Sequence, residues 1–111
     1  MPSFKTARTE EDLKRELADI MRELKDPRVT GLLSIVKLDL ANDYSHCKVF
    51  VSSLEGLEAA QSAVTGLKSA AGFIRRELGL RLRMRRSPEL HFIADDGIAK
   101  SAEINKKLRE L

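Results

Sequence analysis

Cysteine is nearly absent from this chain of 111 residues, because Cys47 is the only one. An intramolecular disulfide is therefore impossible, which fits a reducing compartment. Long apolar runs are also lacking, since no segment approaches the ~20 residues of a membrane-spanning helix. The first residues, from Met1 to Lys5, contain no apolar core of a signal peptide. We therefore expect one soluble, cytoplasmic domain, because a chain of this length can bury one substantial core but not two.

The usual signatures of catalysis are missing as well. No glycine-rich phosphate loop, dinucleotide fingerprint or serine–histidine–aspartate order is present. His91 and Asp95 fall at a strand end, with Asp96 beside them and no third type of ligand nearby, so no metal site is predicted. His46 and Cys47 are adjacent, so on a strand they point to opposite faces and cannot form a dyad. We expect no enzyme, no cofactor and no small-molecule substrate.

Arginine, by contrast, is abundant and concentrated in one segment. Six of the twelve residues from Arg75 to Arg86 are arginine. The segment from Lys68 to Arg86 carries seven basic residues and one acid, a net charge of +6, whereas the rest of the chain carries thirteen basic and sixteen acidic residues, a net charge of −3. The overall charge of +3 hides this polarity. One strongly basic surface is typical of nucleic-acid binding.

Apolar and basic residues alternate strictly from Leu80 to Arg85. Successive side chains of a β-strand point to opposite faces. The alternation therefore predicts a strand with one face in the core and an arginine face outside. The core face comprises Leu80, Leu82 and Met84, and the arginine face comprises Arg81, Arg83 and Arg85. Such a row of guanidinium groups suits phosphates, and the alternative is a solvated outer face of a sheet.

Periodicity predicts an α+β domain with helices packed on one face of a three-stranded sheet. The expected elements are a helix from a capping box at Thr9 to Asp12 up to Pro27, strands at 32–40 and 46–52 paired antiparallel, a helix from Leu57, a kink at Ala70 to Gly72, a helix from Phe73 to Leu78 capped by Gly79, and the arginine strand continued after Pro88 by Leu90 to Ile93. On the first strand, Val36, Leu38 and Leu40 are expected on one face. Residues 1–8 are expected to be a flexible lead, 9–97 the domain, and 98–111 a C-terminal helix or tail.

The chain resembles the ribosome-binding factor A family over most of its length. The matching stretches are Arg15 to Leu17, Lys25 to Arg28, Val36 to Asp43, Cys47 to Ser52, Ala70 to Leu78, Leu82-Arg83, Arg86 to Leu90, and Phe92. The most specific stretch is the one from Ala70 to Leu78, which reads Ala-Ala-Gly-Phe-Ile-Arg-Arg-Glu-Leu.

The resemblance implies a KH-like fold of type II topology, in the order helix, strand, strand, helix, kink, helix, strand. KH modules usually clamp RNA with a Gly-x-x-Gly loop, which this sequence lacks. The family carries an Ala-x-Gly kink instead, matched here by Ala70, Ala71 and Gly72. The resemblance further implies a noncatalytic bacterial factor of ribosome biogenesis. Such a factor binds the small (30S) ribosomal subunit and its 16S rRNA, and supports processing of the 5′ end of the rRNA precursor, above all in the cold. We expect a monomer.

The predicted RNA-binding residues are Lys68, Arg75, Arg76, Arg81, Arg83, Arg85 and Arg86. The alternative function is a protein-interaction module whose arginine face docks an acidic partner. For Gly72, kink geometry and close approach of RNA both remain open, since each needs the missing side chain. Gly66 is read as ordinary helix, where alanine would be neutral or mildly stabilising. Arg28 is predicted to cap the carbonyl groups of the first helix.

Overall fold

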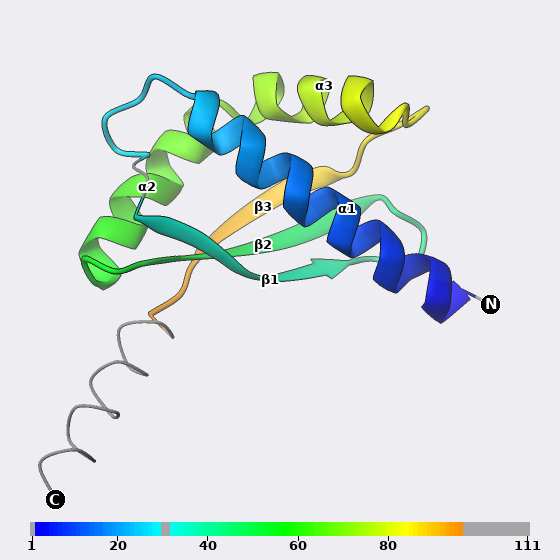
Figure 1. Cartoon of the computed structure of the whole chain (residues 1–111), viewed down its shortest axis with the longest axis horizontal. Helices are drawn as coiled ribbons and strands as arrows, with labels where there is room; N and C mark the ends of the chain where they lie inside the picture. The colour runs from blue at the N-terminus through cyan, green and yellow to red at the C-terminus, as the bar shows by residue number, and fades with distance from the viewer. Residues whose placement is uncertain (1, 30–31, 97–111) are drawn as a thin grey trace, which may run out of the picture.

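The computed structural model describes residues 2–29 and 32–96, which form three helices and three strands (Figure 1). In chain order these elements are α1 (Pro2–Glu23), β1 (Leu33–Leu40), β2 (His46–Ser53), α2 (Leu57–Ser69), α3 (Ala71–Leu82) and β3 (Glu89–Ala94). This order confirms the predicted α+β, KH-like arrangement of type II. Within the described residues, no helix combines the length and apolarity that crossing a bilayer requires. The helix predicted at 98–111 lies outside the described residues.

The sheet has the strand order β1-β2-β3. β1 and β2 pair antiparallel, as predicted, through the turn that follows Leu40. β3 pairs parallel to β2, with His46 opposite Glu89 and Val49 opposite Phe92. Parallel neighbours need a crossover connection, and here α2 and α3 together supply it.

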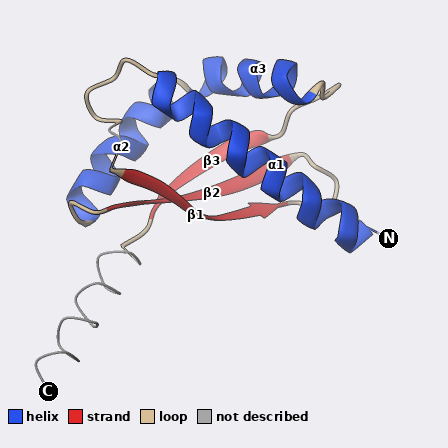
Figure 2. Ribbon diagram, in the orientation of Figure 1, coloured by secondary structure: helices blue, strands red, loops and turns tan. Residues whose placement is uncertain are grey.

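All three helices lie on one face of the sheet (Figure 2). α1 packs on β1 and on α3, whereas α2 packs on β2 and β3. The core between helices and sheet consists of buried apolar side chains: Leu13, Leu17, Ile20, Met21, Val29, Ile35, Leu38, Leu40, Cys47, Val49, Val51, Val64, Leu67, Ile74, Leu78 and Phe92. Within the described residues no element covers the other face of the sheet, where His46, Lys48 and His91 are exposed.

A β-bulge at Val36 changes which residues of β1 face the core. Ile35 pairs with Val51 and Lys37 pairs with Phe50, so Val36 is the extra residue between them. A bulge of this kind shifts the alternation of side chains by one position. Ile35 is consequently buried, and Val36 is only partly buried. The prediction that Val36 shares the core face with Leu38 was therefore wrong.

The first helix begins earlier than predicted. α1 starts at Pro2 rather than at Thr9, so Thr9 lies inside the helix and does not start a capping box. Proline is well tolerated in the first turn, where its missing N–H would have no partner. Residues 2–8, predicted as a flexible lead, therefore belong to the helix. The predicted apolar stripe is confirmed, and its buried members are Leu13, Leu17, Ile20 and Met21.

The predicted interruption between the second and third helices is confirmed. α2 ends at Ser69 and α3 starts at Ala71, with Ala70 between them at φ −97° and ψ 9°. The backbone N–H of Ala70 donates to carbonyl groups of α2, and the carbonyl group of Ala70 accepts from the N–H of Ile74 at 2.9 Å. Ala70 therefore ends the hydrogen bonding of α2 and begins that of α3.

The predicted arginine strand was wrong, because residues 80–82 are helical. α3 continues past Gly79 to Leu82, and Leu80 is 68% exposed instead of buried. Leucine and arginine are good helix formers, and no β-branched residue occurs between Ile74 and Ile93. Leu78 and Leu82 follow Ile74 at intervals of four residues, so the helical period accounts for the apolar character of both positions.

A left-handed residue ends α3. Arg83 adopts φ 53° and ψ 40°. The N–H groups of Arg83 and Met84 both donate to the carbonyl oxygen of Gly79, the second at 2.9 Å. This pattern is a Schellman-type cap, in which Arg83 occupies the position predicted for Gly79. The chain then passes buried Pro88 and enters β3 at Glu89, so proline stays outside the strand ladder.

Candidate nucleic-acid interface

The predicted RNA-binding residues occupy two places around α3. Lys68 lies in the last turn of α2, and Arg75 and Arg76 lie in the first half of α3. Arg81 lies in the last turn of α3, Arg83 ends the helix, and Arg85 and Arg86 lie in the segment between α3 and β3. All are exposed except Arg81. We call the exposed set the basic surface, and its members are Lys68, Arg75, Arg76, Arg83, Arg85 and Arg86.

Two hydrogen bonds hold the segment of residues 83–88 against α3. Arg75 Nε donates to the carbonyl oxygen of Ser87 at 3.1 Å, and Ser87 Oγ donates to the carbonyl oxygen of Arg75 at 3.0 Å. Gly79 faces this segment, and a Cβ built there would lie 3.5 Å from Ser87 Oγ, at ordinary van der Waals distance, so the approach does not depend on the missing side chain. The segment is therefore fixed at both ends, by the cap of α3 and by Ser87. Its arginines project from a fixed backbone rather than from a long free loop.

Four arginines of the basic surface keep their guanidinium groups available. Across residues 2–29 and 32–96, no hydrogen bond or ion pair involves the side chain of Arg76, Arg83, Arg85 or Arg86. Unneutralised guanidinium groups in one region repel one another and attract a polyanion. A phosphate backbone accepts bidentate hydrogen bonds from such groups.

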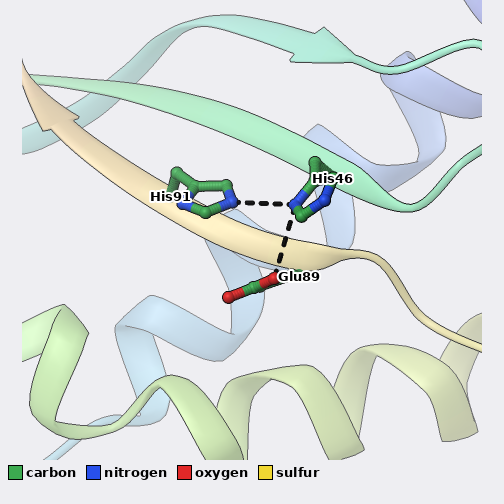
Figure 3. Close-up of side chains that lie close together, drawn as sticks. All are labelled: His46, Glu89 and His91. Atoms are coloured by element: carbon green, nitrogen blue, oxygen red, sulfur yellow. Dashed lines mark hydrogen bonds and ion pairs between the residues drawn. The ribbon is translucent and has the colours of Figure 1, made fainter.

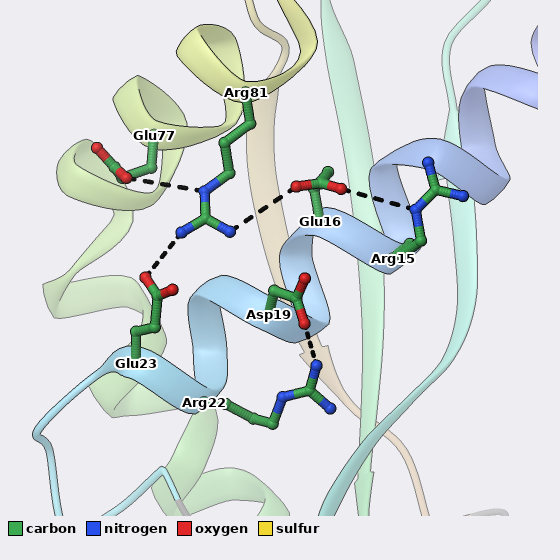
Figure 4. A network of polar contacts seen from close by, with 7 residues as sticks. All are labelled: Arg15, Glu16, Asp19, Arg22, Glu23, Glu77 and Arg81. Atoms are coloured by element: carbon green, nitrogen blue, oxygen red, sulfur yellow. Dashed lines mark hydrogen bonds and ion pairs between the residues drawn. The ribbon is translucent and has the colours of Figure 1, made fainter.

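Arg81 does not belong to this available set. Its guanidinium group contacts three carboxylates, at 2.7 Å from Glu23, 3.8 Å from Glu16 and 3.8 Å from Glu77 (Figure 4). The hydrogen bond with Glu23 is the main cause that raises the pKa of Arg81. Two of the three acids lie on α1, so Arg81 joins α3 to α1. Its predicted place beside Arg83 and Arg85 on a strand face was wrong, because the helical turn points it toward α1.

The arginines of α1 are neutralised within their own helix. Arg15 lies 3.1 Å from Asp12. Figure 4 shows its second contact, at 3.6 Å from Glu16, and the pair of Arg22 with Asp19. These are the i,i+3 pairs and neighbours expected on a solvated helix. Arg76 and Arg83, by contrast, have no such acidic partners within the described residues. The positive charge that is not neutralised therefore lies around α3.

Gly66 and Gly72 have different surroundings. A Cβ built at Gly72 meets no atom within 4 Å, so Gly72 is exposed and relieves no internal clash. A Cβ at Gly66 would lie 3.0 Å from Asp26 Oδ2 and 3.2 Å from Val29 Cγ2. Gly66, read as ordinary helix from the sequence, is thus the glycine that close packing requires. The missing side chain of Gly72 leaves room for a molecule outside the domain.

Alanine substitutions should separate the two glycines. We expect Gly72→Ala to raise the free energy of unfolding by up to about 1 kcal/mol, because alanine favours helix and meets open space. Gly66→Ala should raise the free energy of unfolding by less than this or should lower it, because the new Cβ presses on the Asp26 carboxylate that Arg28 holds in place. Urea denaturation of both variants measures the difference. Equal stabilisation by both would mean that Asp26 moves aside freely.

Arg28 binds the side chain of Asp26 rather than the carbonyl groups of α1. Arg28 Nη2 lies 2.7 Å from Asp26 Oδ2, and Arg28 Nε and its backbone N–H both donate to Asp26 Oδ1 at 3.0 and 2.9 Å. These hydrogen bonds lower the pKa of Asp26 to about 2. The predicted helix cap was wrong, because α1 ends at Glu23 and the next residues turn away from it. The pair instead fixes the carboxylate that faces Gly66.

The open face of the sheet carries a cluster that sequence reasoning missed. His46 on β2 and His91 on β3 place Nδ1 and Nε2 3.0 Å apart, and Glu89 Oε2 lies 3.4 Å from the same Nδ1 (Figure 3). All three side chains are exposed. A usable signal was the Glu-x-His spacing, which puts two ligand types on one face of a strand. The sequence analysis considered His91 only with Asp95 and predicted no metal site, whereas the parallel pairing of β3 with β2 brings His46 close to His91.

Cys47 points away from this cluster, as the alternation predicted. It is fully buried on the helix-covered face, next to exposed His46. Burial is the main cause that raises the pKa of the Cys47 thiol to about 11. The thiol therefore stays protonated near neutral pH and is inert toward metals and oxidants.

Comparisons with known proteins agree on one family. The family model described as ribosome-binding factor A matches residues 5–108. The ribosome-binding factor A of Acetivibrio thermocellus is 45% identical over 104 residues, which cover 93% of this chain and 85% of that protein. The crystal structure of ribosome-binding factor A from Thermus thermophilus matches with a TM-score of 0.70 and 35% identity, over 79% of this chain and 92% of that one.

A further match carries information on a complex. It is a homology model of the Thermus thermophilus ribosome binding factor A, fitted into the cryo-electron microscopy map of a complex with the 30S subunit. Its TM-score is 0.64 at 35% identity, and the match covers 77% of this chain and 89% of that one.

Proposed function

Because the chain belongs to the ribosome-binding factor A family, we propose that it binds the small ribosomal subunit and contacts 16S rRNA through the basic surface. The observation that carries this proposal is the group of four guanidinium groups around α3 that have no partner among the described residues, in a domain whose other basic residues include the neutralised Arg15, Arg22 and Arg81. The fitted 30S complex of the Thermus thermophilus relative supports the choice of partner.

The proposed role is that of a noncatalytic assembly factor. We infer that it acts as a monomer in the bacterial cytoplasm and supports late maturation of the subunit, including processing of the precursor 5′ end and growth in the cold. The kink at Ala70 to Gly72 supports an approach of the RNA backbone, because Gly72 is exposed and has open space above it. Lys68, Arg75 and Arg76 flank that kink in sequence and would hold the phosphates there.

Binding should weaken steeply with salt. If about four to six phosphates are neutralised, log affinity should fall against log salt with a slope of roughly −3 to −5. Sedimentation of the purified protein with 30S subunits over a range of salt concentrations measures this slope. A response that stays flat would remove phosphate contacts from the proposal.

A protein partner is the alternative to RNA. Phe73 and Leu80 are exposed on α3 beside Arg76, so an acidic protein with an apolar patch would also find complementary groups there. Two columns separate the cases, one with immobilised rRNA and one with an acidic protein of similar charge density. Retention by the rRNA column and not by the other supports the RNA-binding function. The reverse result supports the protein-interaction module.

A further inference from the structure

Both histidines of the chain meet on the open face of the sheet, although 45 positions separate them in sequence. The parallel register places His46 opposite Glu89, and His91 follows Glu89 two positions later on the same face. The side chains come from two neighbouring strands and converge above them (Figure 3). Strands fix the backbone positions of all three residues more firmly than a loop would.

The spacing of the three ligand atoms suits a tetrahedral metal ion. Zinc binds imidazole nitrogen and carboxylate oxygen at about 2.0–2.2 Å. Two tetrahedral ligands at that distance lie roughly 3.3 Å apart by geometry. Here His46 Nδ1 lies 3.0 Å from His91 Nε2 and 3.4 Å from Glu89 Oε2, and all three ligand atoms lie within 4.8 Å of one another. Small side-chain rotations bring all three onto one ion.

We propose that His46 Nδ1, His91 Nε2 and the Glu89 carboxylate form a binding site for a divalent transition metal ion of the zinc class. Two imidazoles and one carboxylate favour zinc and its neighbours over magnesium or calcium, which prefer oxygen ligands. Three protein ligands leave the fourth tetrahedral position open to solvent. Cys47 contributes nothing, because it lies on the opposite face.

The alternative to a metal site is a direct hydrogen bond between the two histidine rings. Without an ion, two ring nitrogens 3.0 Å apart share one proton, so that one ring donates and the other accepts. Metal binding requires both of these nitrogens to be free of protons. The ring that donates in the metal-free pair must therefore carry its proton on its other nitrogen when the ion is bound. This change of tautomer is visible for each ring separately.

Titration with zinc chloride tests the site. Protein without an affinity tag should bind one equivalent by calorimetry. His46→Gln, His91→Gln and Glu89→Gln should each weaken binding by at least about tenfold. Glu58→Gln is the matched control, because Glu58 is an exposed carboxylate on α2, away from the cluster. Circular dichroism should show all four variants folded, since each substitution is exposed.

Long-range proton–nitrogen spectra of the unmutated protein give an independent readout. Zinc should shift Nδ1 of His46 and Nε2 of His91, and should leave the proton on the other nitrogen of each ring. Three results would overturn the proposal: no saturable binding, affinity unchanged in both histidine variants, or spectra in which the two nitrogens still share a proton at saturating zinc. None of these results bears on subunit binding, which rests on the arginines.

Discussion

Replacement of Arg76, Arg85 and Arg86 together by glutamine should weaken binding to 30S subunits by about 100-fold or more. Each guanidinium group is exposed and has no partner within the described residues. A hydrogen bond to a charged group contributes about 1.5–3 kcal/mol, and every 1.4 kcal/mol is tenfold in affinity. Three lost phosphate contacts therefore exceed 100-fold even at the low end. Stability should change little, because exposed substitutions usually stay within about 0.5 kcal/mol.

The matched control removes the same charge from α1. Lys14→Gln, Arg15→Gln and Arg22→Gln give a protein of equal net charge, with the losses on an exposed helix face that already carries acids. This variant should bind nearly as well as the original chain. Co-sedimentation at fixed salt measures both, and the slope against log salt should become shallower by about 2 only in the first variant. Equal losses in both variants would mean that total charge matters and that the basic surface is not the contact.

Local signals in the sequence were sufficient for much of the fold. The β-branched stretch from His46 to Ser52 and the turn before it predicted a hairpin that the structure confirms. The Ala70 to Gly72 interruption was visible because glycine weakens a long helical pattern at that point. Both features depend on neighbours in sequence, which is the information a single chain supplies.

The errors share a different cause, because each depends on residues far apart in sequence. Gly66 looked interchangeable with alanine until Asp26 and Val29 were found against it. Arg81 looked like an exposed arginine, and its partners Glu16 and Glu23 lie on α1. No periodicity in one segment contains such contacts. The basic surface could be predicted as a set, because the local density of arginine is the same whether the segment forms a strand or a helix. The direction in which each arginine points differs between the two, so the individual placement of Arg81 was wrong.

The pairing of β3 with β2 also could not be predicted from the local sequence of either strand. The parallel register decides that His91 meets His46. In the sequence, Asp95 lies nearer to His91 than His46 does, and no third type of ligand lies close to His91 and Asp95 along the chain. A strand that returns after two helices can pair with either partner of a hairpin, so the cluster could be found only in the folded chain.

Two leucines in α3 provide the sharpest test of helix against strand. Leu78→Ala should lower the free energy of unfolding by about 2–5 kcal/mol, because Leu78 is fully buried and its loss leaves a cavity. Leu80→Ala should change it by less than about 0.5 kcal/mol, since Leu80 is 68% exposed. A strand through residues 80–85 would instead bury Leu80. Whole-domain stabilities are only about 5–15 kcal/mol, and the first substitution should also lower the melting temperature by about 8 °C or more.

The comparison has an internal control, because both substitutions remove the same atoms from the same residue type two positions apart. Helix propensity changes equally in the two variants, since alanine replaces leucine within one helix. The difference between them therefore reports burial alone. Urea denaturation with equal m-values in both proteins would show that the unfolded states are comparable. A large loss for Leu80→Ala would return Leu80 to the core. Arg81 and Arg83 would then stand on one face again, and the ion pairs that join Arg81 to α1 could not form.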